Sequence, residues 1–226
     1  MNDDLYSLET TKQFFEKYIK FEQIRADSPQ IFERFYDKYK ASFDMFRSTR
    51  NILAHNKVGL TKENYPLIVS KYMLDELNKM IDRMTVKAYS KAIKISEIAS
   101  VETSTSLYDA IKLMNEKNYS YLPLIKDGKI EYVVSEKAII TILANNKEGV
   151  VYDKTVTVGD YIDYFKLDNN SNEFYSFVGR ETLAYDLNNE FNKIKDGKKC
   201  GLLFVTQSGK KDEKVLGMIT LWDVAF

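Results

Sequence analysis

A pattern of helix, strand, tight turn and strand occurs twice in the second half of the chain, and it constrains the fold more than any other feature. In the first occurrence the helix contains Ile111 and Met114, and the strands are 121–125 and 130–134, joined by an Asp127-Gly128 turn. Both strands are rich in branched and aromatic residues, and Asp-Gly is typical of a hairpin turn.

The second occurrence has the same order with longer connections. Its helix runs through Leu187 and Phe191, and its strands are 202–205 and 215–219. A repeated α/β unit of this size predicts two similar halves that pack about a pseudo-twofold axis.

The most specific motif lies at the end of the second copy. The segment Leu216-Gly217-Met218-Ile219-Thr220-Leu221-Trp222-Asp223-Val224 resembles the closing pattern of CBS domains, which is Gly, two apolar residues, Thr, two variable residues and Asp. In the first copy, Leu122-Pro123-Leu124-Ile125 is similar to the apolar-Pro-apolar strand of the same family. We therefore expect a tandem CBS-domain pair (a Bateman module) at 91–226, with copy one at about 92–150 and copy two at about 151–226.

The resemblance implies an adenosine-containing ligand: AMP, ATP, S-adenosylmethionine or a cyclic dinucleotide. Thr220 ends a strand, and Asp223 lies in the first turn of the next predicted helix, where free backbone N–H groups attract phosphate. The Thr220 hydroxyl can bond a phosphate oxygen, and the Asp223 carboxylate can accept both hydroxyls of a ribose. The alternative is a helix cap, in which Thr220 satisfies backbone donors and Asp223 complements the helix dipole.

The first copy departs from the closing motif at two positions. Tyr132 stands where the family has Gly, and Ala138 stands where it has Asp. Ser135 can still bond phosphate and is a third candidate ligand residue, but the carboxylate that would hold the ribose is missing. We therefore expect one nucleotide per chain, bound by the second copy.

The first 90 residues show the spacing of helices rather than strands. Apolar residues at three- and four-residue intervals predict a helix over 8–25, a second from Pro29 and a long one from Pro66. The second helix either continues to about residue 55 or breaks once near Ser42. These patterns predict a bundle of three or four helices.

The run Arg50-Asn51-Ile52-Leu53-Ala54-His55 contains the only histidine of the chain. It resembles the signature of HEPN domains, which is Arg, then four to six residues and then His, usually with a polar residue directly after the Arg. The resemblance implies a bundle that commonly dimerises, and in many members a metal-independent RNase site. In that role Arg50 would bind the scissile phosphate, His55 would act as general acid or base, and Asn51 would orient one of them. The alternative is a surface or interface histidine on a bundle helix.

Composition excludes several other classes. A hydrophobic content of 44% and a charged content of 29% are those of a soluble globular protein. No stretch approaches the ~18 unbroken apolar residues of a membrane span, and Met1-Asn2-Asp3-Asp4 does not begin a signal peptide. The single Cys200 excludes an internal disulfide and fits a reducing cytoplasm. Because Cys/His clusters are absent, we expect no metal site.

Together these patterns predict an α+β protein in which an N-terminal HEPN-like helical bundle at 1–90 precedes the CBS-domain pair. The preferred function is a nucleotide-sensing protein whose bundle acts as a metal-independent endoribonuclease on RNA, under the control of the bound ligand. The alternative is a non-catalytic adenine-nucleotide sensor or scaffold, in which the bundle only dimerises or binds a partner. Both functions predict a cytoplasmic homodimer that needs no cofactor and does not contact membranes.

Overall fold

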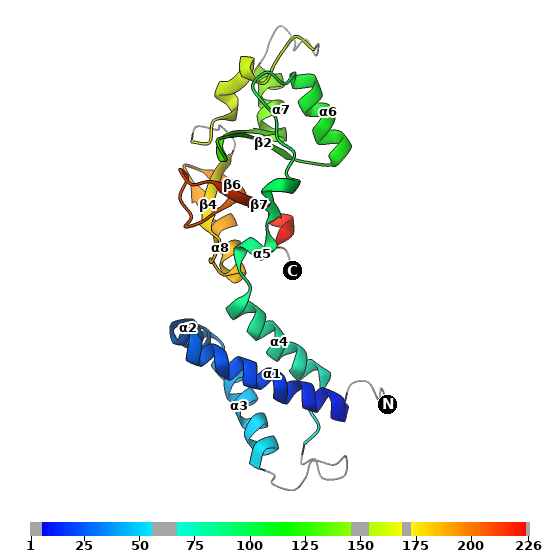
Figure 1. Ribbon diagram of the computed structural model, residues 1–226, viewed down its shortest axis with the longest axis vertical. Helices are drawn as coiled ribbons and strands as arrows, with labels where there is room; N and C mark the ends of the chain where they lie inside the picture. Colours follow the sequence, from blue (N-terminus) through cyan, green and yellow to red (C-terminus); the bar gives the residue numbers. More distant parts are fainter. Residues whose placement is uncertain (1–5, 56–66, 146–153, 169–172, 225–226) are drawn as a thin grey trace. The chain divides into compact units, whose positions relative to one another are not determined.

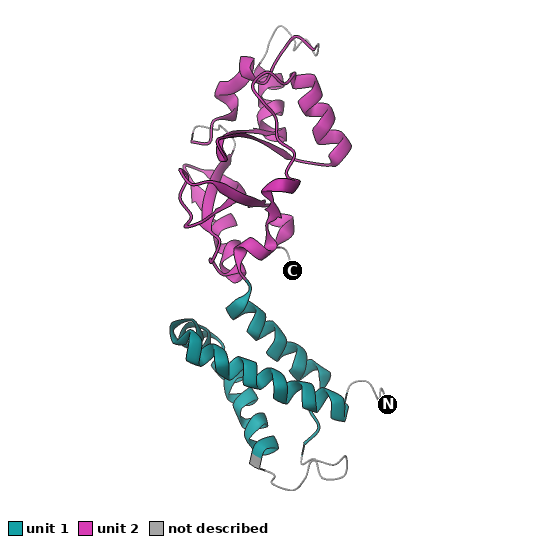
Figure 2. Cartoon of the chain, viewed as in Figure 1, with its two compact units in different colours: residues 1–86 teal, residues 87–226 magenta. Residues whose placement is uncertain are grey.

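The computed structural model describes residues 6–55, 67–145, 154–168 and 173–224, and for His55 only the backbone (Figure 1). The chain divides into two compact units, unit 1 at residues 1–86 and unit 2 at residues 87–226 (Figure 2). Each unit has its own buried core, and each is described by itself.

Unit 1 is mainly helical in its described part, and Tyr6 and Ser70 form an isolated antiparallel bridge. Its helices are α1 (Leu8–Asp27), α2 (Pro29–Lys38), α3 (Lys40–His55) and α4 (Lys71–Thr85). The Ser7 hydroxyl starts α1 by accepting the backbone N–H of Thr10, and Pro29 is the first residue of α2, as predicted. The predicted second helix breaks at Tyr39, close to the expected break near Ser42.

The last helix of unit 1 begins later than predicted. Pro66 lies outside the described residues, and α4 starts at Lys71, where the Ser70 hydroxyl accepts the backbone N–H of Met73. The core of the bundle is aromatic, and the rings of Phe21 and Phe43 meet edge-on with 4.8 Å between centroids. The aromatic spacing in the sequence therefore reflects core packing.

Unit 2 mixes helices and strands. Its described elements, in chain order, are α5 (Ala88–Lys91), β1 (Ile93–Lys94), η1 (Ile95–Glu97), α6 (Leu107–Lys117), β2 (Tyr121–Lys126), β3 (Lys129–Ser135), α7 (Glu136–Asn145), η2 (Gly159–Phe165), β4 (Glu173–Gly179), η3 (Ala184–Asp186), α8 (Leu187–Phe191), β5 (Ile194–Lys195), β6 (Lys198–Thr206), β7 (Val215–Ile219) and η4 (Leu221–Asp223). The label η marks a 3₁₀ helix.

The strands form two sheets. β2 and β3 make an antiparallel hairpin whose turn residues, Asp127 and Gly128, have φ angles of 52° and 78°. The second sheet has the order β1-β7-β6-β4, with β5 beside β6. Within it β4 runs parallel to β6, whereas the β1–β7, β6–β7 and β5–β6 pairs are antiparallel. The strands predicted from the sequence coincide with β2, β3, β7 and the middle of β6, whereas β1, β4 and β5 were not predicted.

Alternating side chains place the two sheets face to face. From β6, Leu202 and Phe204 pack with Ile130 and Val133 of β3, between the two sheets. Leu203 and the other alternate residues of β6 point to the opposite face, where α5 and α8 cover the sheet. The outer face of the β2–β3 hairpin is covered by α6, α7 and η2. Unit 2 is therefore layered, with the two sheets between outer helices.

Candidate functional site

Thr220 and Asp223 lie together at the end of β7, as the motif predicts. The Thr220 backbone N–H and hydroxyl both donate to Asp223 Oδ2, at 2.6 and 2.7 Å. The backbone N–H of Asp223 in turn donates to the Thr220 carbonyl at 3.1 Å. This is a capping box, the arrangement of the capping alternative, and it closes a 3₁₀ turn of three residues.

The two residues between this pair point into solvent. Leu221 is 54% exposed, and Trp222, the only tryptophan of the chain, is 84% exposed. Trp222 thus provides a fluorescent reporter next to the candidate ligand residues.

The glycine of the closing motif has a packing role. A Cβ at Gly217 would lie 2.5 Å from the Ile93 carbonyl oxygen, because β1 pairs with β7 at this point. Only glycine permits such a close approach of two strands. Gly217 of the motif therefore serves the β1–β7 pairing.

Ser135, the candidate from the first copy, lies at the end of β3 and is 1% exposed. Its hydroxyl accepts the backbone N–H of Ala138 at 3.2 Å, which caps the first turn of α7. The same hydroxyl is hydrogen-bonded to Tyr175 of β4. Ser135 is thus engaged by protein groups on both sides.

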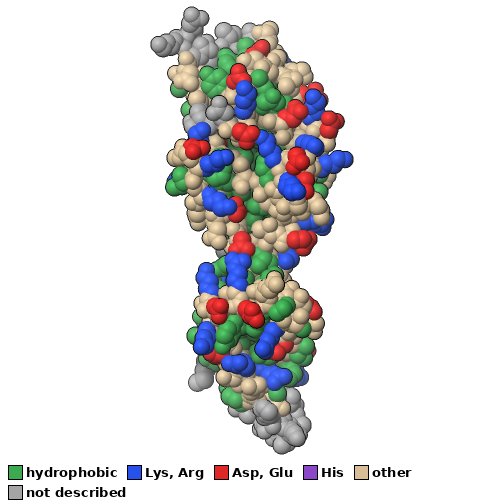
Figure 3. All heavy atoms as spheres, turned by 90° about the vertical axis from the view of Figure 1, so that its left-hand side faces the viewer, with side chains coloured by type: hydrophobic (Ala, Val, Ile, Leu, Met, Phe, Trp, Pro, Cys, Tyr) green, Lys and Arg blue, Asp and Glu red, His purple; other side chains and the backbone are tan. Residues whose placement is uncertain are grey.

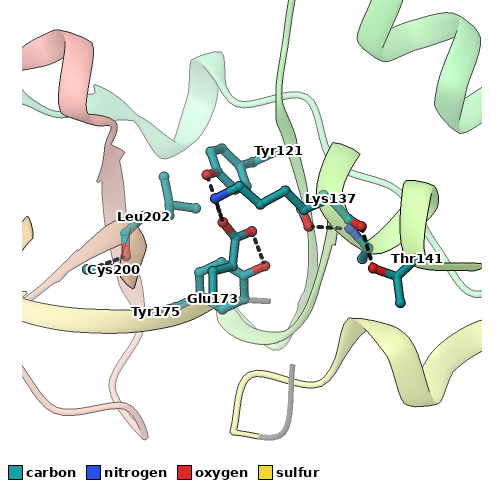
Figure 4. Close-up of polar contacts among 9 residues, drawn as sticks. Tyr121, Lys137, Thr141, Glu173, Tyr175, Cys200 and Leu202 are labelled. Carbon is teal, nitrogen blue, oxygen red and sulfur yellow. Dashed lines mark hydrogen bonds and ion pairs between the residues drawn. The ribbon is translucent and has the colours of Figure 1, made fainter. Parts of the chain in front are cut away.

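Glu173 was not predicted from the sequence as a site residue. Its side chain, which ends in a carboxylate, is 0% exposed. Figure 4 shows this carboxylate between Lys137 and two tyrosines. Lys137 Nζ and Tyr121 Oη donate to Oε2 at 2.8 and 3.3 Å, and Tyr175 Oη donates to Oε1 at 3.1 Å. Three donors thus replace the water that a buried carboxylate would lose.

The environment of this carboxylate has two further signs of tight packing. Burial and the adjacent Glu173 charge raise the pKa of both Tyr121 and Tyr175 above the usual tyrosine range, so both hydroxyls remain donors. A Cβ at Gly201 would lie 2.5 Å from Glu173 Oε2 and 3.0 Å from Tyr121 Oη. Gly201 therefore makes room for the carboxylate between the two copies.

The Arg50–His55 run occupies the end of α3. Arg50 is half-buried, its guanidinium lies 5.9 Å from the centre of the Tyr18 ring, and its Nη1 donates to Asn51 Oδ1 at 3.2 Å. A cavity of about 380 Å³ lies beside Arg50 and is lined by α1 residues that include Glu22. The side chain of His55 lies outside the described residues.

Several general properties accompany these sites. On the face shown in Figure 3, the Lys and Arg side chains of unit 2 are interspersed with Asp and Glu, so the described residues on this face form no single-sign stripe. Among the described residues, no group of three or more His, Cys, Asp and Glu is placed to hold a metal ion.

No described helix has the length and apolar character needed to cross a membrane. Cys200 is a buried free thiol whose pKa is raised by burial to about 11.

The family comparison concerns the first copy. Residues 91–145 match the family model described as "CBS domain". This segment is a CBS domain. The match covers none of unit 1, so the HEPN identity of the bundle stays a prediction, and the second CBS copy continues to rest on its motif and on the repeated strand order.

Several solved structures, among them proteins with CBS domains, are similar to this chain over 62% of its length. A conserved protein from Pyrococcus horikoshii has 17% identity and a TM-score of 0.43, over 62% of this chain and 89% of that one. CBSX2 in complex with AMP has 21% identity and a TM-score of 0.39, over 62% and 92%. The CBS domain of a bacterial CNNM/CorC family Mg²⁺ transporter in complex with ATP has 20% identity and a TM-score of 0.42, over 62% and 84%. No curated protein matches the chain.

Proposed function

We propose that the chain is a nucleotide-sensing regulatory protein whose second CBS copy binds an adenine nucleotide through Thr220 and Asp223. The observation that carries the proposal is the position of this pair at the end of β7, in the copy that follows a CBS domain. CBS proteins with AMP or ATP bound are among the similar structures, which supports this class of ligand.

The chemistry of binding is an exchange of hydrogen bonds. Without ligand, Asp223 accepts the hydroxyl of Thr220 and closes its own turn. With a nucleotide, the Thr220 hydroxyl donates to a phosphate oxygen and the Asp223 carboxylate accepts the ribose hydroxyls. The Thr220 hydroxyl and the Asp223 carboxylate each have a hydrogen-bond partner with and without ligand. The cap in the free protein and the ligand site are therefore two states of the same two residues.

A titration with AMP, ATP, S-adenosylmethionine and cyclic dinucleotides tests this proposal. Calorimetry should give about one ligand per chain, and the fluorescence of Trp222 should change with the same affinity. Asp223→Ala should abolish binding, whereas Ala138→Gly should leave it unchanged because the first copy lacks the carboxylate in both cases. Binding that survives Asp223→Ala would contradict the assignment of the site.

A second proposal concerns unit 1, where the position of Arg50 favours a ribonuclease. Arg50 is held by Tyr18 and Asn51 at the edge of a cavity rather than in an ion pair, among the described residues. In this function Arg50 binds the scissile phosphate of RNA, His55 transfers the proton, and Asn51 orients one of the two. The competing function is a scaffold in which the bundle only dimerises or binds a partner.

RNA cleavage in the presence of a chelator separates these two functions. The ribonuclease predicts cleavage without added metal that is lost in Arg50→Ala and in His55→Ala. Equal cleavage by the wild type and His55→Ala would identify a contaminating nuclease and favour the scaffold.

The same proposal includes assembly as a homodimer, which would bring two Arg50–His55 runs together. On α7 of unit 2, Ile140 is 63% and Leu143 is 39% exposed, although the opposite side of this helix is already buried. A helix that is apolar on both sides, with one side buried and the other exposed, favours a partner surface. Light scattering at micromolar concentration should give the mass of a dimer, and a clean monomer would contradict the proposal.

A further inference from the structure

The first copy already holds an anion from its own chain. Its passage Ser135–Ala138 aligns with Thr220–Asp223 of the second copy and forms the end of β3 and the first turn of α7. Within that passage Lys137 binds the Glu173 carboxylate directly, and Ser135 reaches the same carboxylate through Tyr175. A serine hydroxyl, a helix N-terminus and an ammonium group are the elements that bind phosphate.

We propose that Glu173 is a built-in anion that closes the anion site of the first copy. A phosphate-bearing ligand then binds this copy only by displacing Glu173 from Lys137. The inference extends the nucleotide-sensing function to the regulation of a second site, and it depends on that function only for the identity of the natural ligand.

The exposure of the ion pair determines which partner an external anion can reach. The side chain of Lys137 is 55% exposed, whereas that of Glu173 is 0% exposed. An incoming phosphate therefore meets the lysine from solvent, and the glutamate cannot follow its partner into water. After displacement Glu173 retains the tyrosine donors but loses its cation, which is costly for a buried carboxylate.

A chain of hydrogen bonds from Ser135 through Tyr175 to Glu173 fixes the position of the Glu173 carboxylate beside Lys137. The hydroxyl of Ser135 is hydrogen-bonded to Tyr175, and the hydroxyl of Tyr175 donates to Glu173, so each polar group in the chain is satisfied by the next. Displacing Glu173 disturbs β4, which pairs with β6, and β6 pairs with the β7 strand that ends beside Thr220. The sheet therefore connects the Lys137–Glu173 site of the first copy to the Thr220–Asp223 site of the second copy.

Calorimetry on the full chain at low salt tests the proposal, with tripolyphosphate and ATP as probes. Glu173→Gln removes the internal anion while preserving its size, so it should add a second binding site that is at least tenfold tighter than any first-copy binding in the wild type. The added site should disappear in Glu173→Gln/Lys137→Ala. It should persist in Glu173→Gln/Lys112→Ala, because Lys112 is a similarly exposed lysine that pairs with Glu116 on α6.

A residue-specific readout checks the same proposal without relying on calorimetric stoichiometry. Acylation of lysines by an activated acetate ester, followed by mass spectrometry, should show Lys137 reacting faster in Glu173→Gln than in the wild type. Tripolyphosphate should protect Lys137 in the variant at concentrations that leave the wild type unaffected. If Glu173→Gln does not fold, Glu173→Asp retracts the carboxylate by one methylene and should give smaller changes in the same direction.

The outcomes separate this inference from the proposed function. No added site in folded Glu173→Gln, two equal sites in the wild type, or an added site that survives Lys137→Ala would each overturn the inference. Asp223→Ala should remove only the second-copy site and leave the added site intact. Nucleotide binding that is absent in the wild type, or that survives Asp223→Ala, would overturn the proposed function while leaving the tripolyphosphate result at Lys137 standing.

Discussion

Lys137 and Glu173 meet at 2.8 Å although they belong to different copies of the repeat. The lysine lies in the first turn of α7, and the glutamate is the first residue of β4. Only the lysine reaches solvent, so the pair combines a screened cation with a fully buried carboxylate. Such a pair is more expensive to break than to replace as a whole.

Removing the lysine should therefore destabilise unit 2 strongly. We expect Lys137→Ala to lower the free energy of unfolding by about 3 kcal/mol, the lower end of the range for breaking a buried pair, because the exposed lysine is partly screened. Chemical denaturation measures this value. Lys112→Ala, which breaks an exposed pair on α6, should cost less than about 0.5 kcal/mol. Equal effects of the two substitutions would show that the Glu173 carboxylate is not buried as described.

Gly201 should be intolerant of a side chain for a reason specific to Glu173. An alanine Cβ would lie 2.5 Å from Glu173 Oε2, so Gly201→Ala should destabilise by about 2 kcal/mol through overpacking. The cost should fall in a Glu173→Ala background, where the clashing carboxylate is absent. Strict additivity of the two substitutions in a double-mutant cycle would argue against this contact.

The Thr220–Asp223 pair should contribute to stability even without ligand. Asp223→Ala removes the acceptor of two hydrogen bonds in the capping box, and we expect a loss of about 1 kcal/mol in thermal or chemical unfolding of the free protein. Asp223→Asn keeps an acceptor oxygen and should lose less. A cap contribution equal to zero would imply that the pair is held only when ligand is bound.

The β6–β7 loop should respond to acid through Glu213. The hydroxyl and backbone N–H of Ser208 donate to its carboxylate at 2.6 and 2.7 Å, and they lower its pKa from 4.5 to about 2. Because the pKa is lowered in the folded protein, this contribution is present above pH 4.5 and is lost as the pH falls toward 2. The protection factor of the Ser208 amide, which is its intrinsic exchange rate at each pH divided by the observed rate, should fall over this window in the wild type. In Glu213→Gln this fall should be absent, and a wild-type protection factor that stays constant below pH 4.5 would contradict the contact.

The sequence was sufficient to predict features that depend on local pattern. The β2–β3 hairpin was predicted from the Asp127-Gly128 turn, and β7 from its apolar run and the motif that follows it. The CBS identity of the first copy was recognised in the same way and is confirmed by the family match. The break in the helices of unit 1 was also close to its expected position. Each of these features is encoded within about ten residues.

Features that depend on distant partners were missed. β4 is a strand because β6 offers a parallel edge, and Glu173 is buried because residues 36 and 52 positions earlier supply its donors. The sequence does place Glu173 at the start of an aromatic run that ends at Phe177, which is unusual for an exposed carboxylate. No neighbouring residue, however, indicates which donors Glu173 contacts. The candidate site of the second copy could be proposed from the sequence because its two residues are three positions apart, whereas the Lys137–Glu173 ion pair depends on tertiary structure.

The pairing of β1 with β7 has a consequence for biosynthesis. Ile93 and Lys94 pair with Met218 and Gly217, so the strand at the start of the first copy pairs only with the last strand of the second. During translation the helices of unit 1 can form early, since their contacts are local. The five-stranded sheet must wait until β7 has emerged, and until then the apolar face of the β2–β3 hairpin lacks its cover. Nascent chains arrested between the two copies should therefore depend on chaperones, whereas chains released after β7 should not.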